Sequence, residues 1–175
     1  PATGGFVPMG MPGHLPNVGM PLNPRRARQL LTEAGYPDGQ GFPAAECVAR
    51  PDQVDLEVNL QAQWKENLGV KIKWETAEWP AILARLGEQV PHLLIMGWMA
   101  DYPDPDNFLR ARIDHIQHQS GWRNADYDSL VKRAQRSLDQ GERIRLYGEA
   151  ERILAEEAPI LPIFHASGRL LVKPW

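Results

Sequence analysis

Three carboxylates lie close together in the segment 97–109, GWMADYPDPDNFL, at the end of the longest apolar run of the sequence. Asp101, Asp104 and Asp106 fall within six residues, and prolines between them keep the loop stiff. A carboxylate at the end of a strand, beside the ring of Trp98, suits a cationic group such as a substrate ammonium. Because ligands of open α/β sheets bind at the carboxyl ends of strands, this loop is the first candidate for a binding site.

The three carboxylates divide naturally between structure and function. Asp106 is placed to cap the next helix and Asp104 to stabilise a turn, which leaves only Asp101 without a structural task. We favour this division. A calcium loop is less favoured, because the spacing does not follow the D-x-[DN]-x-[DN]-G pattern. A hydrolase with Asp101 and Asp104 as acid and base is an alternative, and it requires turnover and a raised carboxyl pKa.

Other patterns of catalysis and metal binding are absent from the sequence. It contains no GxGxxG, GxxxxGK[ST], HExxH or GxSxG motif. His115 and His118 could share one helix face, but a metal site normally takes three or four ligands, so we interpret both as surface residues. The single Cys47 permits no internal disulfide, and we expect a buried, unreactive thiol. The sequence therefore predicts a protein that is not an enzyme and that binds neither a metal ion nor a cofactor.

Helical and strand patterns alternate along the chain and predict the framework around this loop. Asn23 suits an N-cap and Pro24 the first position of a helix that closes near Gly35. Further helices are expected at about 52–68, 79–87, 126–139 and 142–157, with a helical turn at 106–113. Strands are expected at 44–50, 70–76, 92–98, 160–164 and 169–172. This alternation predicts an α/β layer fold with a parallel or mixed sheet flanked by helices.

Apolar spacing also predicts which side chains form the core. Trp64 and Trp74 have the helical and strand phases of core residues, whereas Trp79 and Trp122 suit either a core or a ligand contact. The last two helices are expected to bury one apolar face each, made of Tyr127, Leu130, Val131, Ala134 and Leu138 in the first and Ile144, Tyr147, Ala150, Ile153 and Leu154 in the second.

Residues 1–22 differ from the rest, since they hold five prolines and five glycines. They exclude a regular helix or an inner strand and predict an extended arm, followed by a single α/β lobe over residues 23–175. The arm also carries Met9, Met11 and Met20, which could contact a partner surface, so a plain protein-interaction domain is a further alternative.

Composition sets the outer limits of function. The chain has 175 residues, 43% of them hydrophobic, and a formal net charge of −3, as expected of an ordinary globular protein. A pI near 6.0 argues against a general nucleic-acid binder. No stretch approaches the roughly 20 apolar residues needed to span a bilayer. The first residue is Pro1, which we interpret as a cut end.

The segment 97–109 closely resembles the signature of the family 5 extracellular solute-binding proteins, the peptide/nickel-type binding proteins of ABC importers. Three other segments match family patterns in the same order: NPRRARQLLTEAGYPDG at 23–39, WKENLGV at 64–70 and AERILAEEAPILPI at 150–163. The resemblance covers nearly the whole chain, and four ordered matches make it specific.

The resemblance implies a lobe of a larger protein. Family members are longer and close two lobes around the ligand, so this chain would match the C-terminal lobe and lack the N-terminal one. In peptide-binding members, the aspartate at the position of Asp101 pairs with the α-ammonium of the ligand. The family also binds nickel complexes, haem and oligosaccharides, so another solute remains an alternative to oligopeptides or dipeptides.

These implications give the expected function and site. We expect a periplasmic-binding-protein-like lobe that works outside the cytoplasm, periplasmic or extracellular, with a parent that is free or a membrane-associated lipoprotein. Its partners would be a peptide or other small solute, the missing N-terminal lobe and the ABC transporter permease subunits, with no nucleic acid. The expected ligand-binding residues are Trp98, Met99, Ala100, Asp101 and Tyr102.

Overall fold

The chain divides into two compact units in the computed structural model, which describes residues 4–166 and 171–173. Leu22–Trp98 form one unit, here called the sheet unit. The residues before Leu22 join those after Trp98 in the other, here called the helical unit. The separation of an arm at 1–22 from a single lobe at 23–175 stays a prediction.

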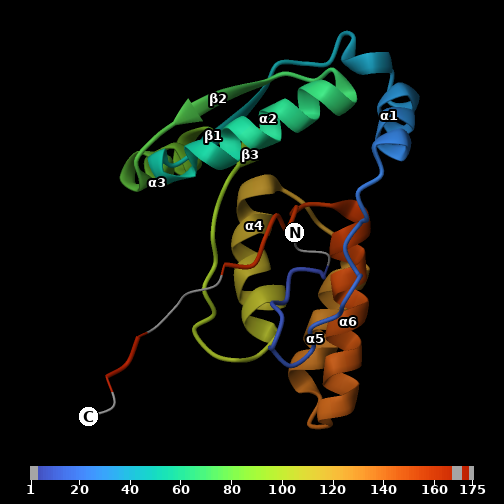
Figure 1. Cartoon of the computed structure of the whole chain (residues 1–175). Helices are drawn as coiled ribbons and strands as arrows, with labels where there is room; N and C mark the ends of the chain where they lie inside the picture. Colours follow the sequence, from blue (N-terminus) through green and yellow to red (C-terminus); the bar gives the residue numbers. More distant parts are fainter. Residues whose placement is uncertain (1–3, 167–170, 174–175) are drawn as a thin grey trace. The chain divides into compact units, whose positions relative to one another are not determined.

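The sheet unit holds three parallel strands in the order β2-β1-β3 (Figure 1). Its elements are α1 (Pro24–Glu33), the turn η1 (Pro37–Gly39), β1 (Ala45–Ala49), the turn η2 (Pro51–Gln53), α2 (Val54–Leu68), β2 (Ile72–Thr76), α3 (Trp79–Glu88) and β3 (Leu93–Leu94). Cys47 of β1 lies opposite Trp74 of β2 and Leu93 of β3. All three strands therefore present their carboxyl ends at one edge, and the predicted α/β class is confirmed.

The core of the sheet unit forms between β1 and α2. Cys47 and Ala49 are buried, and Leu56 and Leu60 of α2 pack against them. The rings of Trp64 and Trp74 stack with centroids 6.1 Å apart, and both tryptophans are half-buried. Trp74 packs against this core as predicted, whereas Trp64 reaches it by stacking on the ring of Trp74.

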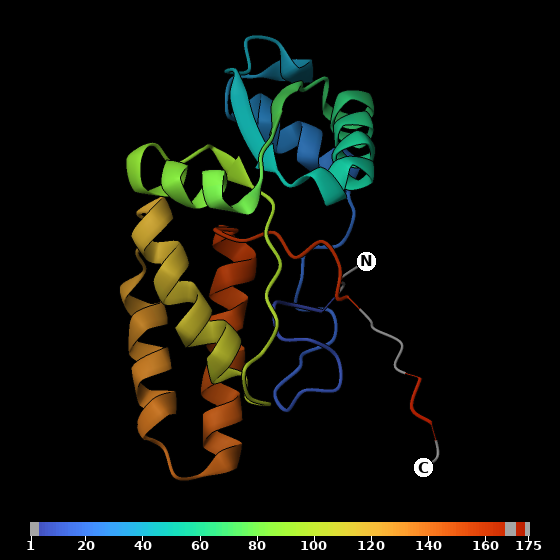
Figure 2. The same cartoon turned by 90° about the vertical axis from the view of Figure 1, so that its left-hand side faces the viewer.

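The helical unit is built around α5 and α6, which lie side by side in both views (Figures 1 and 2). Its elements are the π-helical segment η3 (Asn107–Arg112), α4 (Ile113–Ser120), α5 (Ala125–Arg136) and α6 (Gln140–Glu157). Its buried apolar side chains come from these elements and the N-terminal segment: Val7, Phe108, Leu109, Ile113, Tyr127, Val131, Ala134, Leu146, Tyr147, Ala150 and Leu154.

The N-terminal segment packs into this core without regular structure. Residues 4–21 contain no helix or strand, as their prolines and glycines predict. Val7 is nevertheless completely buried, and the ring of Phe6 meets Phe108 edge-on at 5.4 Å. The segment is therefore part of the core of the helical unit.

Two strand predictions were wrong in extent or existence. Of residues 92–98 only β3 pairs with β1, because β1 ends at Ala49 and Pro51 follows shortly after. Residues 160–164 form no strand, and Pro162 removes a backbone donor from the middle of that run. In the predicted strand at 169–172, residues 169 and 170 lie outside the described residues.

One core prediction was also wrong. Leu138 is fully exposed, because α5 ends at Arg136 and the chain leaves the helical phase before it reaches this residue. Across residues 4–166 and 171–173, no helix combines the length and the apolar character that crossing a membrane requires.

Candidate functional site

Asp106 is the most buried carboxylate of the 97–109 segment, with 7% of its surface exposed. Arg110 donates to it from Nε at 3.0 Å and from Nη2 at 2.7 Å. The hydroxyls of Tyr147 and Tyr102 donate to its two oxygens at 2.6 and 2.8 Å. Asp106 thus joins η3, α6 and the preceding loop through four polar contacts.

These contacts replace the helix cap that the sequence predicted for Asp106. Asp106 does occupy the predicted N-cap position of η3, but its side chain makes no capping hydrogen bond there. Burial alone raises the pKa of Asp106, but the hydrogen bonds from Arg110, Tyr147 and Tyr102 outweigh it and hold the pKa below its usual value. The sequence could not reveal this role, because Tyr147 lies 41 positions away.

Asp104 has the predicted turn role and an ion pair in addition. Its Oδ1 accepts the backbone N–H of Asp106 at 2.8 Å, as expected of a turn aspartate. Arg143 of α6 donates to both carboxylate oxygens, at 2.5 and 2.8 Å. Asp104 and Asp106 are therefore both engaged by arginines.

Asp101 differs from its two neighbours by its exposure. Its Oδ2 accepts a hydrogen bond of 3.4 Å from Nδ2 of the fully buried Asn107. In the part of the chain that the structure describes, ion pairs engage Asp104 and Asp106 but not Asp101. The carboxylate that the sequence left without a structural task is thus the accessible one, and its role in binding stays a prediction.

The other predicted site residues are distributed over both units. Trp98 belongs to the sheet unit and is 36% exposed, whereas Met99, Ala100 and Tyr102 belong to the helical unit. Met99 is almost fully exposed, and Ala100 packs against the helical core. The hydroxyl of Tyr102 is held by Asp106, so only its partly exposed ring is available to a ligand.

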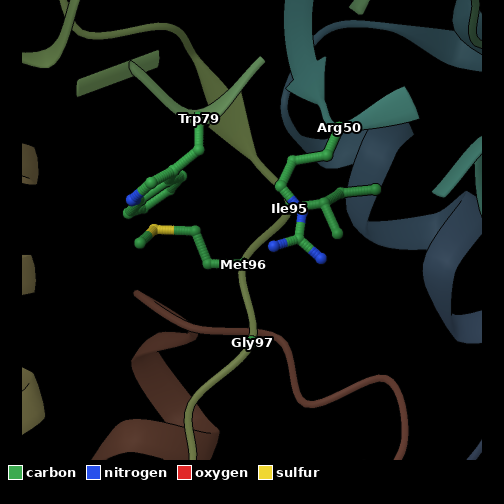
Figure 3. Close-up of a pocket in the computed structure, with 5 residues that line it drawn as sticks. All are labelled: Arg50, Trp79, Ile95, Met96 and Gly97. Carbon is green, nitrogen blue, oxygen red and sulfur yellow. The ribbon is translucent and has the colours of Figure 1, made fainter. Parts of the chain in front are cut away.

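A pocket of about 210 Å³ lies at the carboxyl edge of the sheet and was not predicted (Figure 3). Its lining comes from the chain after each of the three strands: Arg50 after β1, Trp79 after β2, and Ile95, Met96 and Gly97 after β3. Figure 3 shows the ring of Trp79 next to the side chain of Met96, with the guanidinium of Arg50 across from them. Position directly after a parallel strand was the signal that could have found these residues.

The pocket combines apolar walls with one cation. Trp79 is 38% exposed, which settles the open choice for this residue in favour of an accessible ring. The guanidinium of Arg50 donates to Asp52 at 2.6 and 3.1 Å. Since both side chains of this pair are exposed, the pair is weak in water and an anionic ligand group can compete for Arg50. The lining suits a small apolar group that carries a carboxylate nearby.

Metal binding finds no support in the described residues, where no cluster of three or more histidine, cysteine, aspartate or glutamate side chains is arranged to hold an ion. Trp122, which the sequence left open, has a structural position. Its ring packs edge-on against Tyr127 at 5.2 Å, and its Nε1 donates to Glu157 at 2.7 Å.

Comparison with known proteins identifies the family. Residues 1–114 match the model described as bacterial extracellular solute-binding proteins, family 5 Middle. The chain is 37% identical to di/tripeptide-binding protein 1 of Pseudomonas aeruginosa over 84% of its own length, and it spans 29% of that relative. It is 31% identical to heme-binding protein A of Haemophilus influenzae over 88% of its length, again spanning 29% of the relative.

A solved structure gives the same result. The ABC transporter-associated periplasmic binding protein DppA from Helicobacter pylori, in complex with the peptide STSA, matches with a TM-score of 0.73 and 30% identity. The match covers 89% of this chain and 31% of that one. The chain therefore belongs to the family 5 bacterial extracellular solute-binding proteins.

Proposed function

We propose that this chain is part of an ABC importer's solute-binding protein that binds short peptides, with Asp101 as the anchor of the ligand α-ammonium. The observation that carries the proposal is the exposure of Asp101 beside two carboxylates that arginines already hold. The names of the relatives support the ligand class, because they include di/tripeptide-binding proteins and a peptide complex of an ABC transporter-associated protein.

A carboxylate is chemically suited to this task. It accepts hydrogen bonds only, and a charge-assisted bond to an ammonium is about twice as strong as a neutral one. Trp98 would add an aromatic wall, which attracts a cation through its ring face. Met99, Ala100 and Tyr102 would complete the binding segment around Asp101.

The pocket on the sheet unit offers a second kind of ligand contact. Within the sheet unit, we assign to Trp79 and Met96 the packing of an apolar group, and to Arg50 the binding of a carboxylate. A guanidinium forms two parallel hydrogen bonds with a carboxylate, and it would exchange its exposed bond to Asp52 for them.

The same contacts favour binding over catalysis by a carboxylate pair. A carboxylate pair for hydrolysis needs two available groups, one of them with a raised pKa. Arg143 engages both oxygens of Asp104, so Asp104 is not available as the second carboxylate of such a pair with Asp101. The protein would act with a second lobe and permease subunits, in the periplasm or outside the cell, with the parent free or membrane-associated.

A ligand screen on the full-length protein tests the proposal. The panel would contain di- to pentapeptides, N-acetylated peptides, nickel complexes, haem and oligosaccharides, each read by thermal shift and calorimetry. A ligand at 100 times its Kd stabilises the folded state by about 2.7 kcal/mol, which raises Tm measurably. Stabilisation by free peptides supports the proposal.

Two other results would change it. Binding of haem, a nickel complex or a sugar, without any peptide, would replace the ligand class within the same family. Haem is a specific alternative, because a relative at 31% identity is named for it. Turnover of a substrate by a protein that retains no ligand would contradict a binding function altogether.

A further inference from the structure

We propose that Arg143 is a positioning residue for Asp101, acting through Asp104 and the backbone of the loop between them. This inference rests on the proposed function, because it concerns how the anchor carboxylate is held for an ammonium group. Arg143 lies on α6, 39 positions beyond Asp104, and belongs to the same unit as the loop.

The contact between Arg143 and Asp104 is a bidentate ion pair. Nη1 donates to Oδ2 at 2.5 Å and Nη2 donates to Oδ1 at 2.8 Å. The side chains are 19% and 26% exposed, so water screens this pair less than a surface pair. Two parallel hydrogen bonds fix both the distance and the orientation of the carboxylate.

Asp104 in turn orders the backbone on both sides of it. Its N–H donates to the carbonyl of Tyr102 at 2.9 Å, and Tyr102 is the residue next to Asp101. On the other side, its carbonyl accepts the N–H of Asn107 at 3.1 Å. Asn107 is fully buried, and its side chain reaches back to Asp101. Both of these backbone contacts involve Asp104, the residue whose carboxylate Arg143 holds.

A second tether from α6 strengthens the same arrangement. Tyr147 lies one helical turn after Arg143 and donates to Asp106 at 2.6 Å. The guanidinium carbon of Arg143 lies 5.2 Å from the centre of the Tyr147 ring, which is within the range of a cation–π contact. The loop is thus fixed to one helix at two adjacent points.

Ordering of this kind matters for binding because an exposed carboxylate has several rotamers. Fixing its side chain when the ligand arrives costs conformational entropy, and a loop that is already ordered avoids part of that cost. Two prolines within the loop, Pro103 and Pro105, restrict the unbound backbone further. Loss of Arg143 should therefore weaken recognition of the ammonium without removing any atom that touches it.

The test compares Arg143→Gln with Arg145→Gln as a matched control. Arg145 lies on the same helix and pairs with Glu149 at 2.5 Å, so the control removes an arginine and an ion pair that do not touch the loop. The readout is the ratio of Kd for an N-acetylated peptide to Kd for the free peptide. We expect Arg143→Gln to lower that ratio about five- to tenfold and Arg145→Gln to leave it unchanged.

A ratio separates positioning from simple destabilisation, because a poorly folded variant loses affinity for both peptides equally. Asp104→Asn is the second variant, since it breaks the ion pair from the other side and keeps the side-chain size. It should lower the ratio by a similar factor, and the double variant should be no worse than either single one. Hydrogen exchange of the amides of Asp104, Asp106 and Asn107, without ligand, should quicken in Arg143→Gln and in Asp104→Asn but not in Arg145→Gln.

The Asp101→Asn variant distinguishes failure of this inference from failure of the proposed function. One result is that Asp101→Asn binds the acetylated and the free peptide equally, while Arg143→Gln keeps the wild-type ratio of Kd values and the wild-type rate of hydrogen exchange. That result overturns the positioning role of Arg143 and leaves Asp101 as the anchor. If Asp101→Asn leaves the ratio of Kd values unchanged, the result contradicts both the anchor role of Asp101 and the positioning role of Arg143. On the Asp101→Asn background, Arg143→Gln should have no further effect on the ratio.

Discussion

The backbone N–H of Val7 donates a hydrogen bond of 2.8 Å to Oε1 of Glu151, a residue 144 positions later in the chain. Glu151 is 1% exposed, and its Oε2 has no hydrogen-bond partner among the described residues. Burial raises the pKa of Glu151, and the backbone hydrogen bonds of Val7 and Phe6 offset only part of that shift. A buried carboxyl on α6 therefore fastens the N-terminal segment to the helical core.

The raised pKa predicts how Glu151→Gln changes stability with pH. Because the folded pKa of Glu151 lies above its ordinary value of 4.5, the contribution of Glu151 to stability is complete below about pH 4.5 and is lost as pH rises through the folded pKa. The amide keeps an acceptor for Val7 and carries no charge. We expect Glu151→Gln to gain stability relative to the wild type as pH rises.

Urea unfolding at several pH values between 4 and 8 measures this difference. Glu149→Gln is the matched control, since Glu149 lies on the same helix with its side chain 39% exposed. A difference between Glu151→Gln and the wild type that stays constant over this range would contradict the buried carboxyl as the source of the pH dependence.

The close packing around Glu151 predicts a cost for any side chain at Gly5. A methyl group there would lie 2.3 Å from Oε1 of Glu151 and 2.5 Å from Cγ1 of Val18. We expect Gly5→Ala to lower the free energy of unfolding by about 1–3 kcal/mol, the usual cost of overpacking. Gly87→Ala on α3 meets nothing within 4 Å and should be neutral or stabilising by about 0.5–1 kcal/mol.

Chemical denaturation of both alanine variants gives the comparison. An equal small effect for Gly5→Ala and Gly87→Ala would show that the N-terminal segment moves away from Glu151 easily. That result would contradict the packing of this segment into the helical core.

Cys47 offers a probe of unfolding in the sheet unit. It is 2% exposed, and burial raises the pKa of its thiol to about 12, so almost no thiolate exists at pH 8. Iodoacetamide should therefore leave the native protein unlabelled while it alkylates the urea-unfolded chain fully. Rapid labelling of the native protein, followed by mass spectrometry, would contradict the burial of β1.

Local spacing explains why most of the helices and the strands β1 and β2 were predictable. The apolar repeat of α2 and the Asn23-Pro24 start of α1 are signals within a few residues, and both elements end within two residues of their predicted limits. The Asn23 side chain accepts the N–H of Arg26 at 3.0 Å, as an N-cap should. The family resemblance likewise depended on short segments in order, and the comparisons confirmed it.

Contacts between distant residues explain what the sequence could not supply. The spacing of Asp101, Asp104 and Asp106 could suggest separate roles, but only the fold brings Arg143 and Tyr147 to that loop. A carboxylate in a turn looks the same in sequence whether an arginine holds it or not. The pocket around Arg50 was missed for a related reason, since its lining comes from three separate strand ends.

The most direct measurement is the affinity of the full-length protein for a free and an N-acetylated peptide, with the wild type beside Asp101→Asn. Asp114→Asn is the control, because Asp114 is an exposed aspartate of the same unit, its side chain 61% exposed. If Asp101 anchors the ammonium, acetylation and Asp101→Asn should each weaken binding at least tenfold, and acetylation should cost nothing further in the variant. Equal affinity of the wild type and Asp101→Asn for the free peptide would contradict the account.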